Sequence, residues 1–212
     1  MIEHEVNFMN NFIMGWYPED TSFCDELIEY YHRPETIKIE GIIGSVSTEG
    51  IVNKNIKDST DASFRPDMMG VFKYSKILKT CADLYYEKYP YSSGVGYGLT
   101  QGFNIQRYLP KGGFKQWHSE RNSADYPDVS RHLVWMTFLN DVTDGGGTQF
   151  FYQGLTIKAE KGLTLIWPAD WTFTHRGEVS NTQEKYIITG WYNLFNDKLL
   201  KLKEQNENRN LL

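Results

Sequence analysis

The residues of this 212-residue chain best suited to metal chemistry are its five histidines. His118 is the only one with a carboxylate two positions later, in the run His118-Ser119-Glu120. Residues i and i+2 of an extended chain point to the same face, so these two side chains converge on one point. His175 follows the next β-rich segment and is the candidate for a third ligand. The pattern therefore predicts a metal site built from two histidines and one carboxylate.

Such a ligand set is used by one well-defined class of iron site. Two histidines and a carboxylate on one face of the ion, with the other positions open, form the facial triad of non-haem Fe(II) oxygenases. The spacing alone leaves a plainer interpretation open. A chain with 27 acidic residues produces short His-x-acid patterns by chance, and His118 and His175 would then be ordinary structural or surface histidines.

A lysine further along the chain favours the metal interpretation. Lys185 lies ten residues after His175 and opens a strongly β-like run that ends near Asn193. A lysine on this strand can reach the pocket of the expected metal site. Burial of an unpaired ammonium group is costly, so a buried lysine requires an anionic partner. A dicarboxylic cosubstrate would supply one.

Residues 101–194 resemble a known family, the Fe(II)/2-oxoglutarate-dependent dioxygenases, and within that family the prolyl 4-hydroxylase-like branch. The landmarks follow the family's order and spacing. They are Arg107-Tyr108, His118-Ser119-Glu120, the long run 131–142 with its Leu-Asn-Asp-Val ending, the glycine turn 144–150, the segment 158–167, His175, Lys185 and Trp191.

The resemblance implies a double-stranded β-helix, or jelly-roll, core and a role for each matching residue. His118, Glu120 and His175 would bind Fe(II) and leave positions for 2-oxoglutarate and O2. Lys185 would pair with the distal carboxylate of 2-oxoglutarate, and Tyr108 would donate its hydroxyl to the same group. The implied reaction hydroxylates an unactivated C–H bond, on a prolyl residue of a peptide or protein, and releases succinate and CO2. Ascorbate is a further cofactor that the resemblance implies.

The sequence departs from the family pattern at several places. Glu120 stands where the family has aspartate, and it is longer by one methylene. The retained carboxylate disfavours the halide exchange of the related halogenases. Val134 replaces a threonine that many relatives carry near the cosubstrate. The loop 121–130 is polar and matches poorly, which leaves the substrate open.

Two other functions compete with the hydroxylation of a peptide. The same chemistry can act on a free amino acid or another small molecule, because one fold supports many substrates. A non-catalytic jelly-roll binding module is the second alternative, and the intact ligand set together with Lys185 argues against it.

Several side chains near the landmarks have no assigned role. Trp117, beside the first ligand, is the best candidate for substrate contact, whereas Trp191 is expected in the core. Arg131 and Arg176 either approach the pocket or form surface ion pairs. His132 follows Arg131 inside a strand and is expected to bind no metal.

The elements that position these residues form a mainly β fold with supporting helices (α+β) in one domain, 1–212. Apolar residues at helical spacing predict helices over 23–31 and 70–88, with short extended segments over 37–51 and a polar loop over 53–69. Short β-rich runs separated by glycine and proline are typical of a sandwich or barrel. We expect these strands at 102–109, 132–139, 148–152, 155–158, 162–167 and 185–194. Residues 1–93 would support a catalytic core over 94–195, and a tail helix would cover 196–212.

Composition limits the partners. The net charge of −5 gives no overall attraction to nucleic acid, and no apolar run is long enough to span a membrane. Two cysteines make no disulfide framework, and the N-terminus lacks the features of a secretory signal. We therefore expect a cytoplasmic protein that binds neither nucleic acid nor membrane; the sequence does not predict its oligomeric state.

Overall fold

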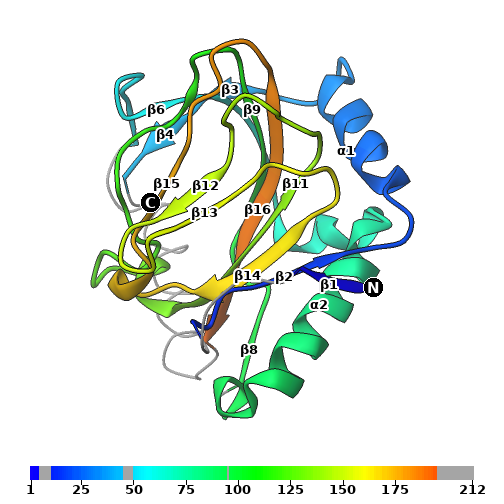
Figure 1. Cartoon of the computed structure of the whole chain (residues 1–212), viewed down its shortest axis with the longest axis vertical. Coiled ribbons are helices and arrows are strands. Elements are labelled where there is room, and N and C mark those ends of the chain that lie inside the picture. The colour runs from blue at the N-terminus through cyan, green and yellow to red at the C-terminus, as the bar shows by residue number, and fades with distance from the viewer. Residues whose placement is uncertain (5–10, 45–49, 95, 195–212) are drawn as a thin grey trace, which may run out of the picture.

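A large antiparallel sheet organises the chain (Figure 1). The computed structural model describes residues 1–4, 11–44, 50–94 and 96–194, so the tail helix expected over 196–212 lies outside the described residues. The strands of the large sheet are, in spatial order, β1 (Ile2–His4), β2 (Met14–Tyr17), β14 (Thr164–Pro168), β11 (Arg131–Phe138), β16 (Lys185–Leu194), β9 (Phe103–Tyr108), β7 (Thr60–Phe64) and β3 (Ile39–Glu40). A further strand, β8 (Tyr97–Gly98), pairs with the end of β16.

A smaller sheet lies against one face of the large sheet, and two helices cover the other face (Figure 1). Its strands are β13 (Leu155–Ile157), β12 (Thr148–Phe150) and β15 (His175–Gly177), and two ribbons accompany it, β10 (Gly113–Phe114) with β6 (Lys57–Asp58) and β4 (Ile42–Ile43) with β5 (Ile51–Val52). The helices are α1 (Ser22–His32) and α2 (Tyr74–Lys88), and short 3-10 turns span Pro66–Val71, Pro90–Ser93, Asp128–Ser130 and Trp171–Phe173. The predicted mainly β, jelly-roll fold with supporting helices is confirmed.

The alternation of side chains along β11 divides the hydrophobic core in two. Leu133 and Trp135 point toward the helices and join the core between the helices and the sheet. Val134, Met136 and Phe138 point the other way, into the core between the two sheets. Because successive strand residues face opposite sides, a continuous apolar run serves both layers.

Both predicted helices are present, and each buries one apolar stripe. Helix α1 buries Phe23, Leu27 and Tyr31, and α2 buries Tyr74 and Leu78 among others. The second helix begins at Tyr74 rather than near residue 70, because the backbone at residue 72 is extended and separates it from the preceding 3-10 turn. Neither helix combines the length and apolar character needed to cross a bilayer, within the part of the chain that the structure describes.

The prediction of a polar loop over 53–69 is wrong. This segment contains β6 and β7, and β7 pairs with β9 inside the large sheet. Ala62 and Phe64 of β7 are buried toward the helices, whereas Asp61 and Ser63 line a cavity on the opposite face. The sequence of β7 is rich in polar residues because the face of the strand opposite the helices lines this cavity. Strands β1, β2, β3 and β7 thus extend the sheet from within the first 93 residues.

The contact between β16 and β11 depends on a residue without a side chain. Gly190 lies opposite Trp135 in the register of the two strands. A Cβ atom at Gly190 would lie 2.3 Å from Trp135 Cζ2 and 3.0 Å from Phe103 Cβ. The buried indole of Trp135 fills the space that a side chain at this position would occupy.

Gly190→Ala is therefore expected to lower the free energy of unfolding by about 1–3 kcal/mol, because overpacking a filled core forces neighbours out of place. Guanidinium denaturation measures the change. Gly70→Ala is the matched control, since no atom lies within 4 Å of its Cβ position. An unfolding midpoint of the first variant equal to that of the second contradicts this account of the packing.

Candidate active site

Backbone pairing brings the two predicted histidine ligands together. The amide of His118 donates to the carbonyl of His175 at 3.0 Å, and the amide of His175 donates to the carbonyl of His118 at 2.8 Å. His175 opens β15 and pairs with Phe150 of β12, so the smaller sheet holds this bridge. The imidazole ring centroids lie 4.4 Å apart.

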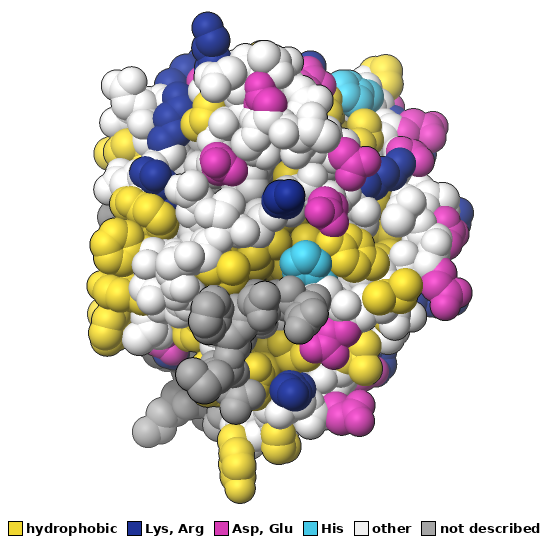
Figure 2. All heavy atoms as spheres, viewed as in Figure 1, with side chains coloured by type: hydrophobic (Ala, Val, Ile, Leu, Met, Phe, Trp, Pro, Cys, Tyr) yellow, Lys and Arg dark blue, Asp and Glu magenta, His cyan; other side chains and the backbone are white. Residues whose placement is uncertain are grey.

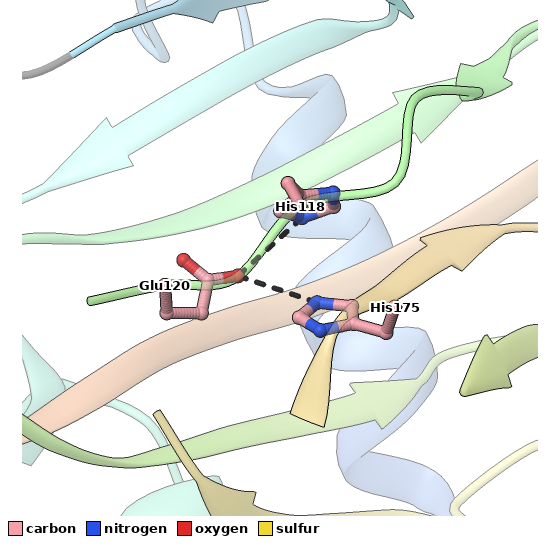
Figure 3. Close-up of side chains that lie close together, drawn as sticks. All are labelled: His118, Glu120 and His175. Atoms are coloured by element: carbon pink, nitrogen blue, oxygen red, sulfur yellow. Dashed lines mark ion pairs between the residues drawn. The ribbon is translucent and has the colours of Figure 1, made fainter. Parts of the chain in front are cut away.

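Glu120 completes a cluster of three side chains (Figure 3). Its Oε1 lies 3.4 Å from His175 Nε2 and 3.6 Å from His118 Nε2. One ligand atom from each residue falls within 4.8 Å of the others, a spacing that can hold a metal ion. Glu120 and His118 come from the segment after β10, and His175 comes from β15.

Hydrogen bonds fix the orientation of both imidazoles. Nδ1 of His118 lies 2.9 Å from the carbonyl oxygen of Gln116, and Nδ1 of His175 lies 2.9 Å from that of Phe173. A carbonyl oxygen only accepts, so each Nδ1 carries the proton and each Nε2 has a free lone pair. These lone pairs face Glu120, which is the arrangement that a metal ligand requires.

Aromatic rings pack against the two histidines of this cluster. Phe114 stacks on His118 at a centroid distance of 3.7 Å and an angle of 10°. Trp167 and Phe150 contact His175 at 5.2 Å and 5.7 Å. Apolar surroundings of this kind strengthen electrostatic interactions inside the site.

The protonation states suit metal binding. Burial, with a contribution from His175, lowers the pKa of His118 and keeps its imidazole neutral. Burial by itself would raise the pKa of Glu120, but the two neighbouring imidazoles lower it well below its usual range. The neutral form of His118 and the ionised form of Glu120 are the forms in which these groups bind a cation.

Lys185 and Tyr108 meet across the paired strands β16 and β9. The Lys185 ammonium is buried, donates to the carbonyl oxygen of Gly146 at 2.8 Å and lies 5.0 Å from the centre of the Tyr108 ring. Burial lowers the pKa of Lys185 to about 8, and the charge of Glu178 opposes this shift. The Tyr108 hydroxyl donates to Gln106 Oε1 at 2.5 Å, and burial raises its pKa.

One cavity of about 380 Å³ joins these groups. His118, Glu120 and His175 line it, as do Lys185 and Tyr108. The structure thus brings all five predicted site residues to one cavity inside the jelly roll.

The residues without an assigned role take different places. Trp117 does not line the cavity; it packs against Phe151 at 5.1 Å and under the Arg176 guanidinium at 4.4 Å. His132 lies 2.7 Å from the carbonyl oxygen of Ser92 and is not part of the metal cluster.

Two further residues line the cavity. Arg131, for which the sequence left a place at the pocket or a surface ion pair open, lines the cavity and is nearly buried, with 11% of its side chain exposed. Trp191, expected in the core, also lines the cavity and donates its indole N–H to Glu120 Oε2 at 2.9 Å.

A buried ion pair in the same cavity was not predicted. Lys57 Nζ lies 2.5 Å from Asp61 Oδ2, and the Ser59 hydroxyl donates to Asp61 Oδ1 at 2.7 Å. Lys57, Ser59 and Asp61 alternate in the sequence, and that period of two is the signal that would have indicated a polar strand face.

Comparison with known proteins agrees with this geometry. Residues 103–193 match the family model of the 2OG-Fe(II) oxygenase superfamily. The matched segment is less than half of the chain and resembles a 2OG-Fe(II) oxygenase domain. The match and the prolyl 4-hydroxylase fold together support a 2-oxoglutarate-dependent dioxygenase, and Fe(II), 2-oxoglutarate and O2 are the cofactor and cosubstrates of the matched superfamily. A comparison of the sequence with curated proteins found no match.

Three solved structures illustrate the likeness in fold. The collagen prolyl hydroxylase of Paramecium bursaria Chlorella virus-1 is 17% identical, with a TM-score of 0.65 over 88% of this chain and 98% of that one. A prolyl-4-hydroxylase from Pseudomonas putida is 14% identical, with a TM-score of 0.60 over 88% and 95%. A Trichoplax adhaerens prolyl hydroxylase, solved with a peptide fragment of the hypoxia inducible factor oxygen degradation domain, is 15% identical, with a TM-score of 0.67 over 91% and 87%.

The cluster predicts specific metal binding by the oxygenase. His175→Ala is expected to weaken the binding of Fe(II) or Co(II) at least about tenfold, because it removes one of three donors. Anaerobic calorimetric titration measures the affinity. His32→Ala is the control, since His32 contacts the Tyr186 hydroxyl away from the cluster. Equal affinities of the two variants would remove His175 from the site.

Proposed function

We propose that the oxygenase binds Fe(II) through His118, Glu120 and His175, and 2-oxoglutarate through Lys185 and Tyr108. It then hydroxylates a C–H bond of a prolyl residue in a peptide or protein and releases succinate and CO2. The observation that carries the proposal is a single cavity that holds a three-donor cluster and a buried lysine whose hydrogen-bond acceptor, among the described residues, is a backbone carbonyl.

The donor set fits iron. Two imidazole nitrogens and one carboxylate oxygen suit Fe(II), and three protein donors leave positions for a 2-oxo acid and O2. Iron bound there would couple the oxidative decarboxylation of 2-oxoglutarate to the hydroxylation of the substrate. The chain contributes two Nε2 donors, an ionised Glu120 and an aromatic ring stacked on His118.

The charges in the cavity indicate where the distal carboxylate binds. Lys57 is paired with Asp61, and the guanidinium of Arg131 lies 2.9 Å from Asp128. Lys185, in contrast, has a backbone carbonyl as its hydrogen-bond acceptor among the described residues. A buried ammonium without an anion is unfavourable, so the distal carboxylate of 2-oxoglutarate would offset its desolvation.

Tyr108 lies beside this ammonium and completes the same end of the cavity. Its ring faces Lys185, and its hydroxyl is held by Gln106. We propose that the hydroxyl turns from Gln106 to the bound carboxylate and becomes its second donor.

Part of the cavity lining favours an uncharged substrate side chain. Ile39, Ile42 and Ile43 line the cavity, and Asn104 and Thr189 add neutral polar groups. Ile39 and Ile42 remain 45% and 46% exposed, so their apolar surface is free to contact a substrate. Figure 2 shows, on the face drawn there, hydrophobic side chains around a histidine and mixed charges elsewhere. A prolyl side chain in an extended peptide matches this uncharged lining.

The pKa of Lys185 predicts how 2-oxoglutarate binding depends on pH. The carboxylate binds the charged ammonium, and a pKa of about 8 means that this form is lost as pH rises above 8. The affinity for 2-oxoglutarate should therefore be highest below pH 8 and fall about tenfold by pH 9. Anaerobic titration of the Co(II)-loaded protein measures this profile.

Lys185→Arg is the control for this profile, because arginine stays charged throughout the range. Its affinity for 2-oxoglutarate should stay constant from pH 7 to 9, whereas Lys185→Ala should bind weakly at every pH. A profile of Lys185→Arg that still falls above pH 8 assigns the titration to another group.

The reaction is tested by its products. With Fe(II), 2-oxoglutarate and O2, proline-containing peptides should gain one oxygen, and one succinate should form per hydroxylation. Mass spectrometry measures both, with and without ascorbate, and His175→Ala should form neither product.

Two outcomes would contradict parts of the proposal. Succinate formation that only small molecules stimulate overturns the peptide substrate. The absence of succinate with every substrate, in a protein that binds iron, overturns the hydroxylase function.

A further inference from the structure

The carboxylate ligand of this oxygenase is held by two residues that do not belong to the ligand cluster. Glu120 has one more rotatable bond than aspartate, and it lies at the wall of a cavity of about 380 Å³. Without restraint its carboxylate would sample several rotamers, at a cost in entropy when one of them binds a metal.

The two oxygens of Glu120 have different partners. Oε1 faces the Nε2 atoms of His175 and His118 at 3.4 Å and 3.6 Å. Oε2 points away from them and accepts the indole N–H of Trp191 at 2.9 Å. Oε1 is thus directed to the proposed metal position, and Oε2 accepts a hydrogen bond from a residue of strand β16.

Trp191 is well placed to restrain this carboxylate. It lies on β16 opposite Val134 of β11, in the middle of the large sheet. The guanidinium of Arg131 stacks on its ring at 3.9 Å, a cation–π contact that fixes the plane of the indole.

Arg131 also holds Glu120 directly. It donates to the backbone carbonyl of Glu120 at 2.8 Å and lies 3.6 Å from Oε2. Asp128, at 2.9 Å, and Gln101, at 3.1 Å, fix the guanidinium from the other side. Both the backbone and the side chain of Glu120 are therefore tied to one stacked pair.

We infer that Trp191 and Arg131 are positioning residues that make Glu120 a ligand through one oxygen. This inference rests on the proposed function, since it takes Glu120 as a metal ligand. A carboxylate that bound the ion through both oxygens would occupy a position that the 2-oxo acid needs. The Trp191 N–H would prevent this by engaging Oε2, and the stacked Arg131 holds the indole in place.

Trp191→Phe is the direct test, because phenylalanine keeps an aromatic ring under Arg131 and removes the N–H. Titration with Co(II) and then with 2-oxoglutarate, followed through the Co(II) absorption bands, measures both affinities without turnover. Both are expected to weaken about tenfold, the size typical for a lost partner of a metal ligand. Trp171→Phe is the matched control, since Trp171 is 64% exposed and lies outside the cavity.

A second pair of variants separates positioning from simple packing. Glu120→Asp is too short to keep both the Trp191 contact and its place beside the imidazoles. In that background Trp191→Phe should change the affinities less than about twofold, because the interaction is already lost. Arg131→Lys, which keeps the charge but not the planar stack, should resemble Trp191→Phe and serves in its place if that variant does not fold.

The outcomes are distinct. A Trp191→Phe protein with wild-type affinities for Co(II) and 2-oxoglutarate overturns the inference and leaves the proposed function intact. Equal losses in the wild-type and E120D backgrounds also overturn it, because they would show a packing defect. A wild-type protein that binds neither Co(II) nor 2-oxoglutarate overturns the proposed function itself.

Discussion

The reciprocal hydrogen bonds between the backbones of His118 and His175 are the constraint on which the site depends. They join the segment after β10 to β15 and set the separation of the two imidazoles before any ligand binds. Each imidazole is then oriented by a carbonyl two residues earlier in the chain. Glu120 follows His118 by two residues, and its Oε1 reaches the Nε2 atoms of both imidazoles. The ligand cluster therefore depends on backbone pairing between segments that lie far apart in the sequence.

Around this bridge, the large sheet serves two layers at once. Tyr186, Ile188 and Tyr192 of β16 pack toward the helices, whereas Lys185 and Trp191 face the cavity. The helices stabilise the sheet from outside, so the inner face is free to carry polar and charged groups. This division explains how a chain of ordinary size holds several buried ions without losing its core.

The three cationic side chains of the cavity differ in their partners, and this difference distinguishes ion pairs that stabilise the structure from a group free to bind a ligand. Lys57 and Arg131 each have a carboxylate partner, and both pairs are largely shielded from water. Lys185 is left with a backbone carbonyl and an aromatic ring. A cavity that pairs two cations with carboxylates and leaves a third with a backbone carbonyl as its acceptor is suited to an anionic ligand at that position.

Periodicity in the sequence predicted both helices and a β-rich sandwich or barrel, because the spacing of apolar residues is a local property. The order of the motifs carried a family resemblance, and that resemblance implied the jelly roll and the residues that meet in the cavity. The sequence by itself did not determine the role of β7, whose polar residues made it look like a loop. Nor did it indicate that Trp191 and Arg131 hold Glu120, since residues far apart in the sequence meet there only through the pairing of β11 with β16. Which face of a strand is buried, and against what, depends on long-range packing, and only the tertiary structure decided it.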